Sequence, residues 1–152
     1  MTRRRPRDVA WFGVQLALFL AMLAAPLIDR RPVPRMVRLA GAALQLLGVG
    51  VALAGYRALG SSHSPWSTPR AEARLVNHGI YGQLRHPIYL GWAVGGLGAA
   101  LLAGSRLGVA VAIAGGIFYD ARARDEERQL TQTYARYADY VSSSSRFLPG
   151  LY

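Results

Sequence analysis

The stretch HGIYGQLRHPIYLGWAVGGLGAALLAGS, residues 78–105, decides how this chain folds. Polar and charged side chains end at His86, and from Pro87 to Ser105 no charged residue occurs. As a helix rising ~1.5 Å per residue, such a run nearly matches the ~30 Å hydrocarbon core of a bilayer. Proline is suited to a first helical turn because its φ is fixed and it lacks an N–H. The stretch therefore predicts a membrane-crossing helix that starts at Pro87.

Three other uncharged runs share this character, and with the first they predict spans at about 9–28, 39–57, 87–105 and 107–121. The last run is too short to cross alone, so we expect its helix to continue into residues 120–132, where opposite charges recur four residues apart. The expected fold is an all-α integral membrane protein with about four transmembrane helices and a helical cytosolic C-terminal extension. Residues 1–152 would form one membrane-embedded domain.

Composition supports this class. The 152 residues are 52% hydrophobic and only 17% charged, with a mean hydropathy of +0.17 despite a net charge of +10. Disorder needs low hydrophobicity beside high charge, so it is excluded. All 18 basic residues are arginine, and they flank the apolar runs, which favours contact with membrane lipids over nucleic acid. The absence of cysteine and the spacing of the three histidines predict no metal site.

Arginine counting predicts the orientation. With the N-terminus inside and four spans, 13 arginines fall on the cytoplasmic side and five outside. We therefore expect a multi-pass protein with both termini cytoplasmic. A cleaved signal peptide is the alternative for residues 9–28, but the run is long for one and Pro26–Arg30 is a poor cleavage site.

Small residues suggest how the helices pack. Gly41, Gly48, Gly50 and Gly55 lie in the second run, and GxxxG spacings follow in residues 91–108. Such glycines let neighbouring helices approach closely in a membrane. Residues 60–85 are rich in serine, proline and other turn formers, so they predict a loop outside the hydrocarbon.

Two polar clusters carry the candidate chemistry. The first is Gly79-x-Tyr81-x-x-x-Arg85-His86-Pro87-x-Tyr89-x-Gly91, which ends inside the third run. The second follows about 35 residues later and contains Arg122, Glu126 and Glu127, with Tyr137, Tyr140, Arg146 and Pro149 behind it. This pattern resembles the isoprenylcysteine carboxyl methyltransferase family and the related phospholipid methyltransferases, over about residues 77–149.

The resemblance implies S-adenosylmethionine-dependent methyl transfer to a lipophilic small-molecule or prenylated acceptor that enters from the bilayer. It places the cofactor in residues 77–92 and 119–149, and Arg122 and Glu126 as catalytic residues. The implied cofactor-binding residues are Tyr81, Arg85, His86, Pro87, Tyr89, Gly91, Glu126, Glu127 and Tyr137. The acceptor stays open between an isoprenylated carboxylate, a phospholipid amine and a small thiol.

The residues themselves suit that chemistry. The amides of Ile88, Tyr89 and Leu90 at a helix start could bind a carboxylate. Glu126 and Glu127 diverge by about 100° on a helix, so only one can face a given ligand. A planar Arg122 can hold a carboxylate by two parallel bonds. Each of these residues also has a plainer interpretation: Tyr89 as an aromatic at the membrane interface, Glu126 and Glu127 as part of a solvated charged surface, and Arg122 as an arginine that extends to the lipid headgroups. Two other functions stay open, a membrane reductase using NADPH and a non-catalytic membrane scaffold.

Overall fold

A computed structural model describes residues 6–60 and 75–150. In chain order the elements are α1 (Pro6–Ile28), α2 (Arg35–Leu59), the 3-10 helix η2 (Gly79–Gly82), α3 (Pro87–Ala103), α4 (Arg106–Thr133) and α5 (Tyr137–Ser143). Within the described residues there is no strand, only an isolated parallel bridge between Leu84 and Ser145. The predicted all-helical class is therefore confirmed.

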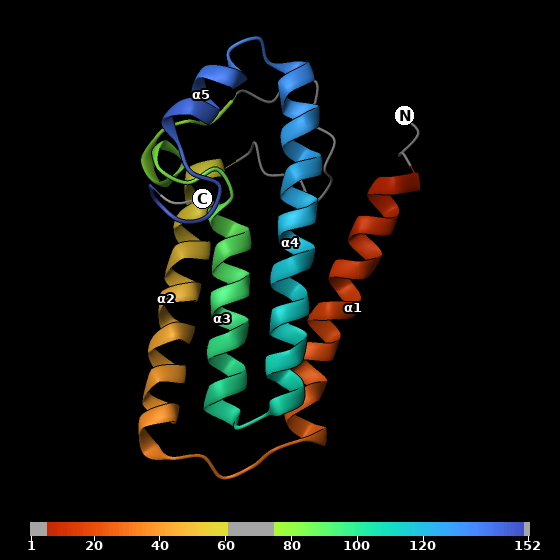
Figure 1. Ribbon diagram of the computed structural model, residues 1–152, viewed down its shortest axis with the longest axis vertical. Helices are drawn as coiled ribbons and strands as arrows, with labels where there is room; N and C mark the ends of the chain where they lie inside the picture. Colours follow the sequence, from red (N-terminus) through yellow and green to blue (C-terminus); the bar gives the residue numbers. More distant parts are fainter. Residues whose placement is uncertain (1–5, 61–74, 151–152) are drawn as a thin grey trace.

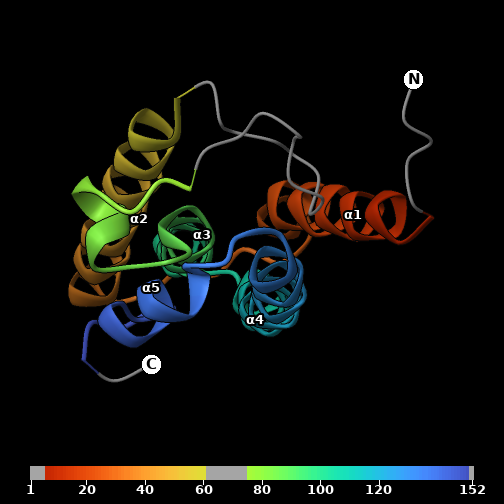
Figure 2. The same ribbon diagram turned by 90° about the horizontal axis from the view of Figure 1, so that it is seen from above.

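The four long helices alternate in direction (Figure 1). The start of α1, the end of α2, the start of α3 and the end of α4 share one end of the bundle, and η2 and α5 lie at that same end. Seen along the bundle, α3 lies between α2 and α4, while α1 stands outside against α4 (Figure 2). The two polar clusters of the sequence are thus gathered at one end.

Local signals explain where the helices begin and end. Pro87 opens α3 as predicted, and Gly104 ends it with a φ of 68°. The Ser105 hydroxyl then accepts the Gly108 N–H at 2.8 Å and caps α4. As expected, α4 runs on through the charged residues, to Thr133. α2 begins at Arg35, four residues before the predicted span, because Pro34 ends the loop and the arginines extend from the helix end.

Glycines bring α2 and α3 into backbone contact. Cβ atoms added at Gly48 and Gly98 would lie 2.3 Å from the backbone nitrogens of Gly95 and Gln45. Gly50, by contrast, has no neighbour within 4 Å of such an atom and takes no part. We call the contact the glycine seam, formed by Gly41, Gly48, Gly55, Gly91, Gly95 and Gly98.

Two of the helices, α1 and α2, are long and apolar enough to cross a membrane. Their large side chains stay exposed, as for Leu23 (58%) and Leu46 (73%), so they present an apolar surface suited to lipid. α3 is apolar but has only 17 residues, and the second half of α4 is charged. The number of spans beyond these two stays a prediction.

Candidate active site

Tyr89 of α3 and Glu126 of α4 meet at the polar end of the bundle. The Tyr89 hydroxyl donates to Glu126 Oε1 at 2.6 Å, and Arg122 Nε donates to the same oxygen at 3.2 Å. The Arg122 guanidinium also stands 5.4 Å from the centre of the Tyr89 ring. Arg122 is only 2% exposed, so its charge is balanced by Glu126 in a buried setting rather than extended to lipid headgroups.

Glu127 points elsewhere, as the divergence of adjacent helical residues predicts. Arg85 Nε donates to Glu127 Oε1 at 2.8 Å, and Arg146 Nη2 donates to Oε2 at 2.7 Å. Burial would raise the pKa of Glu127, but His86, Arg146 and Arg85 outweigh it and hold the pKa well below the ordinary value. We call Glu127, Arg85 and Arg146 the tail clamp.

The chain after α5 folds back onto the segment before α3. The Arg85 N–H donates to the Ser145 carbonyl at 2.8 Å, and the Ser145 N–H donates to the Gln83 carbonyl at 2.9 Å. The Tyr140 hydroxyl donates to the Tyr81 carbonyl at 2.6 Å. Burial raises the pKa of Tyr140 to about 12, so it stays a neutral donor. The C-terminal tail is therefore part of the site.

His86 is buried between the two acids. Its Nε2 lies 3.3 Å from Glu127 Oε1 without hydrogen-bond geometry, and its Nδ1 lies 3.8 Å from Glu126 Oε2. Its ring stacks on Tyr89 with centroids 5.5 Å apart. One expectation at this helix start is wrong: the Leu90 amide is not available to a ligand, because it donates to the His86 carbonyl at 3.1 Å within the first turn.

A small polar cavity of about 80 Å³ lies in front of these residues. Glu126 stands behind its wall, bonded to Tyr89 and Arg122. The lining residues are Gln15, Tyr56, Leu59, Tyr81, Arg85, His86, Ile88, Tyr89 and Arg122. Four of the predicted site residues in the first cluster and Arg122 thus converge on one space.

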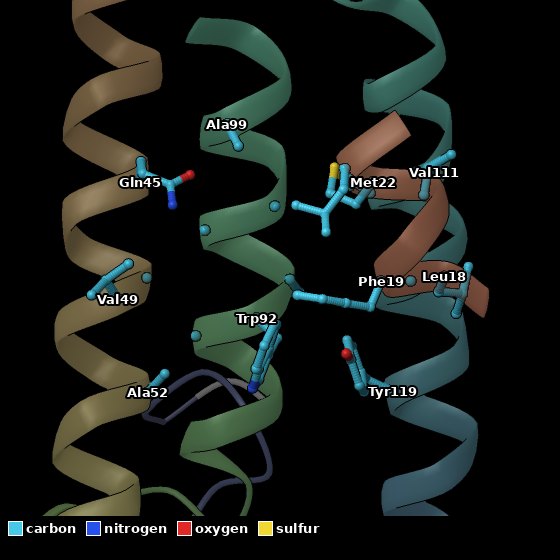
Figure 3. A pocket seen from close by; sticks show the side chains of 18 of the residues that line it. Leu18, Phe19, Met22, Gln45, Val49, Ala52, Trp92, Ala99, Val111 and Tyr119 are labelled. Atoms are coloured by element: carbon cyan, nitrogen blue, oxygen red, sulfur yellow. The ribbon is translucent and has the colours of Figure 1, made fainter. Parts of the chain in front are cut away.

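An apolar groove of about 360 Å³ runs along the bundle between α1, α2, α3 and α4 (Figure 3). Phe19 of α1 and Trp92 of α3 meet edge to face across it at 5.5 Å. Tyr56 lines both the groove and the polar cavity, and Trp92 Nε1 donates to its hydroxyl at 3.3 Å. The two spaces are therefore neighbours that share Tyr56 as a lining residue.

A third space, the outer cavity, has a volume of about 580 Å³ and lies between residues 75–82 and 133–143. Its lining includes Asn77, Arg136, Asp139 and Tyr140. Tyr140 lines this outer cavity and donates a hydrogen bond to the carbonyl of Tyr81, which lines the polar cavity. This space falls inside the region that the sequence assigns to a cofactor.

Several predicted site residues do not line the polar cavity. Pro87 packs toward Gly55, and Gly91 faces Ala52 in the glycine seam and borders the apolar groove. Tyr137 is 1% exposed and packs edge to face against Tyr140. Glu127 belongs to the tail clamp.

Sequence reasoning missed the residues that α1 and α2 contribute. Gln15 Oε1 accepts a hydrogen bond from Arg122 Nη1, although 107 positions separate them. Gln15 was visible as the polar exception in an apolar run, and Tyr56 as the last uncharged residue before Arg57, but nothing in the sequence gave either a partner. A further contact that the sequence did not predict joins α1 to buried Asp125 of α4, which accepts a hydrogen bond from Trp11 Nε1 at 3.0 Å.

The fold and these contacts define a helical membrane protein with a polar site beside a groove in its apolar bundle. The family model of the phospholipid methyltransferases matches residues 36–137, which is two thirds of the chain. The chain belongs to the phospholipid methyltransferase family. The resemblance seen in residues 77–149 is thereby confirmed.

A solved structure has the same fold. The eukaryotic intramembrane Ras methyltransferase isoprenylcysteine carboxyl methyltransferase, determined without a monobody, superposes with a TM-score of 0.69 at 19% sequence identity. The match covers 99% of this chain and 55% of that chain, so the present chain spans about half the length of that protein. No curated protein matches the chain.

Proposed function

We propose that the chain is an integral-membrane methyltransferase that transfers a methyl group from S-adenosylmethionine to a lipophilic acceptor. One observation carries the proposal: a polar cavity lined by buried Arg122 and His86 and an apolar groove share the lining residue Tyr56. An acceptor with a polar head and an apolar tail fits that pair of spaces, and the groove lies where lipid can reach it. Membership in the methyltransferase family supports the same assignment.

The residues present fit the cofactor's chemistry. The bound cofactor would supply an electrophilic methyl group on a positively charged sulfur. Aromatic rings favour such a cation, and the tyrosines Tyr81 and Tyr89 line the polar cavity. Glu126 places a negative charge directly behind Tyr89. A cavity of about 80 Å³ holds only the reacting end, and the outer cavity has a volume typical of small-molecule sites.

Arg122 favours a carboxylate as the acceptor. Its guanidinium is buried, borders the polar cavity and is oriented by Glu126. A carboxylate held by Arg122 would accept the methyl group through a new C–O bond, and the electron pair of the broken C–S bond would stay on the sulfur of the bound cofactor. The charges of carboxylate and sulfonium cancel, so no proton is transferred and no general base is needed. Alignment by Arg122 would supply most of the rate enhancement.

A phospholipid amine is the second candidate acceptor, favoured by the family to which the chain belongs. An amine must lose a proton before it attacks, and His86 borders the cavity as the available base. A guanidinium has only hydrogen-bond donors, so Arg122 can bind a carboxylate but not a cationic headgroup, which is why we place the carboxylate first.

Ligand-dependent melting in detergent tests the cofactor. S-adenosylhomocysteine at a hundred times its Kd should stabilise the folded protein by ~2.7 kcal/mol, because it binds the native state alone. NADP should not change the melting temperature. Stabilisation by NADP but not by S-adenosylhomocysteine would contradict the proposal and favour a reductase.

Substituting Arg122 by lysine tests the acceptor. The variant keeps the charge and loses the planar fork. With N-acetyl-S-farnesylcysteine and radiolabelled methyl donor, we expect turnover to fall roughly tenfold to a hundredfold, while S-adenosylhomocysteine affinity in calorimetry changes little. An Arg122→Ala enzyme with native turnover on this carboxylate would contradict the role of Arg122.

A further inference from the structure

The first helix carries a stripe of residues that faces the bundle. Arg7, Trp11, Gln15, Leu18 and Met22 recur at intervals of three and four, so they share one side of α1. The upper part of the stripe is polar and the lower part is apolar. Leu18 and Met22 line the apolar groove, whereas Gln15 lines the polar cavity.

Two sets of contacts anchor the polar part of this stripe to α4. Arg7 and Trp11 bind buried Asp125 at 2.6 Å and 3.0 Å, and the Trp11 ring packs edge to face on Phe118 at 5.4 Å. One turn further along, Gln15 accepts from Arg122. The Asp125 contacts fix the position of α1, so Gln15 need not hold the helix in place.

Gln15 is the neutral partner of the buried arginine. Arg122 Nε is bonded to the carboxylate of Glu126, and Nη1 is bonded to the amide oxygen of Gln15. Two bonds on different nitrogens fix the plane of a guanidinium. Because the amide carries no charge, it accepts from Arg122 without adding a second negative charge to that of Glu126, so an anionic ligand meets less repulsion.

We propose that Gln15 is a positioning residue that orients Arg122 toward an anionic acceptor, and that α1 thereby forms the wall that selects the acceptor. The proposal rests on the proposed function and extends it to a helix outside residues 36–137, the part matched by the family. The polar head would lie in the polar cavity, beside the hydrogen-bonded pair of Gln15 and Arg122, and the apolar tail would continue past Leu18 and Phe19 along the groove.

Two substitutions separate orientation from charge. Gln15→Leu removes the oxygen that accepts from Arg122, so we expect kcat on N-acetyl-S-farnesylcysteine to fall roughly tenfold or more. Gln15→Glu keeps an accepting oxygen but adds a negative charge beside Arg122. We expect it to raise KM for the carboxylate and to abolish the preference for N-acetyl-S-farnesylcysteine over its methyl ester in binding.

Gln129→Leu is the matched control. Its amide donates to Asp125 at 3.3 Å and it does not line the polar cavity, so the same substitution there should leave kcat and the carboxylate preference unchanged. The proposal is overturned if Gln15→Leu keeps the wild-type kcat, or if Gln15→Glu keeps the preference for the carboxylate over its methyl ester. It is also overturned if Gln129→Leu lowers kcat and abolishes that preference.

Calorimetry with S-adenosylhomocysteine separates this inference from the proposed function. All three variants should bind it with wild-type affinity, since Gln15 acts on the acceptor side. If the wild-type protein binds no S-adenosylhomocysteine, the proposed function is contradicted. The role of Gln15 is still tested in that case, by whether the protein binds N-acetyl-S-farnesylcysteine more tightly than its methyl ester. A wild type without that preference overturns the role of Gln15 directly.

Discussion

Two adjacent glutamates illustrate how one residue step separates two roles. Glu126 turns toward Tyr89 and Arg122 beside the polar cavity, and Glu127 turns toward the tail clamp. We expect Glu126→Gln, which keeps size and removes charge, to weaken S-adenosylmethionine binding about tenfold and to lower the melting temperature, because buried Arg122 loses its counter-charge. Isothermal calorimetry on the folded variant checks this. Unchanged affinity would move the cofactor away from Glu126.

Glu127 gives the fold a dependence on acid. Its pKa in the folded state is held well below the ordinary 4.5, chiefly by His86, Arg146 and Arg85 acting against the effect of burial. A carboxyl group with a depressed pKa contributes stability above pH ~4.5, and that stability is lost as the pH falls below this value. Melting temperatures in detergent should therefore be level from pH 7 to 5 and decline toward pH 3.5.

The control for this titration is Glu127→Gln. The variant lacks the titrating group, so it should melt lower at pH 7 and show a shallower decline toward acid than the wild type. A decline as steep as that of the wild type would assign the acid sensitivity to other carboxyl groups. Asp29 is one of these, because hydrogen bonds from the Leu107 amide and then from Arg31 also lower its pKa.

At the scale of helices, the glycine seam makes a sharp prediction. A methyl group at Gly48 would meet the Gly95 backbone nitrogen at 2.3 Å, so α2 and α3 must separate to admit it. Overpacking of this kind costs ~1–3 kcal/mol. We expect Gly48→Ala to lower the melting temperature by several degrees, measured by thermal denaturation in detergent.

Gly50→Ala is its internal control, two residues along the same helix. Nothing lies within 4 Å of a Cβ added there, and alanine is a better helix former than glycine. The variant should melt at or above the wild-type temperature. Equal losses at Gly48 and Gly50 would show that the seam is not tightly packed.

The helices were largely predictable because their signals are local. Uncharged runs predict α1 to α4, and Pro87 predicts the start of α3 to the residue. The short helix α5 and the bridge between Leu84 and Ser145 were not predicted, because each depends on a tail returning across some 60 positions. The motif residues of the site were predictable by resemblance, but Gln15 was not, since its partner Arg122 is known only once α1 packs on α4.

For the whole molecule, orientation in the membrane is the open prediction. The start of α1 and the end of α4 lie at one end of the bundle, and the turn between α1 and α2 lies at the other (Figure 1). The arginine asymmetry places the first end in the cytoplasm. A reporter fused after Arg35 and one fused after Tyr152 should therefore show opposite sidedness. The same sidedness for both would contradict a four-span arrangement.

The tail clamp also decides where the chain can be cut or extended. Arg146 is one of the two arginines that bind Glu127, and the segment that carries it forms the backbone bridge at Ser145. A protease that trims the chain before Ser144 would remove one side of the site while leaving every long helix intact. Expression tags spliced in beyond Leu148 keep that side, whereas tags that replace residues from Ser144 onward remove Arg146 and the bridge at Ser145, so we expect such a protein to melt lower and to bind S-adenosylhomocysteine more weakly.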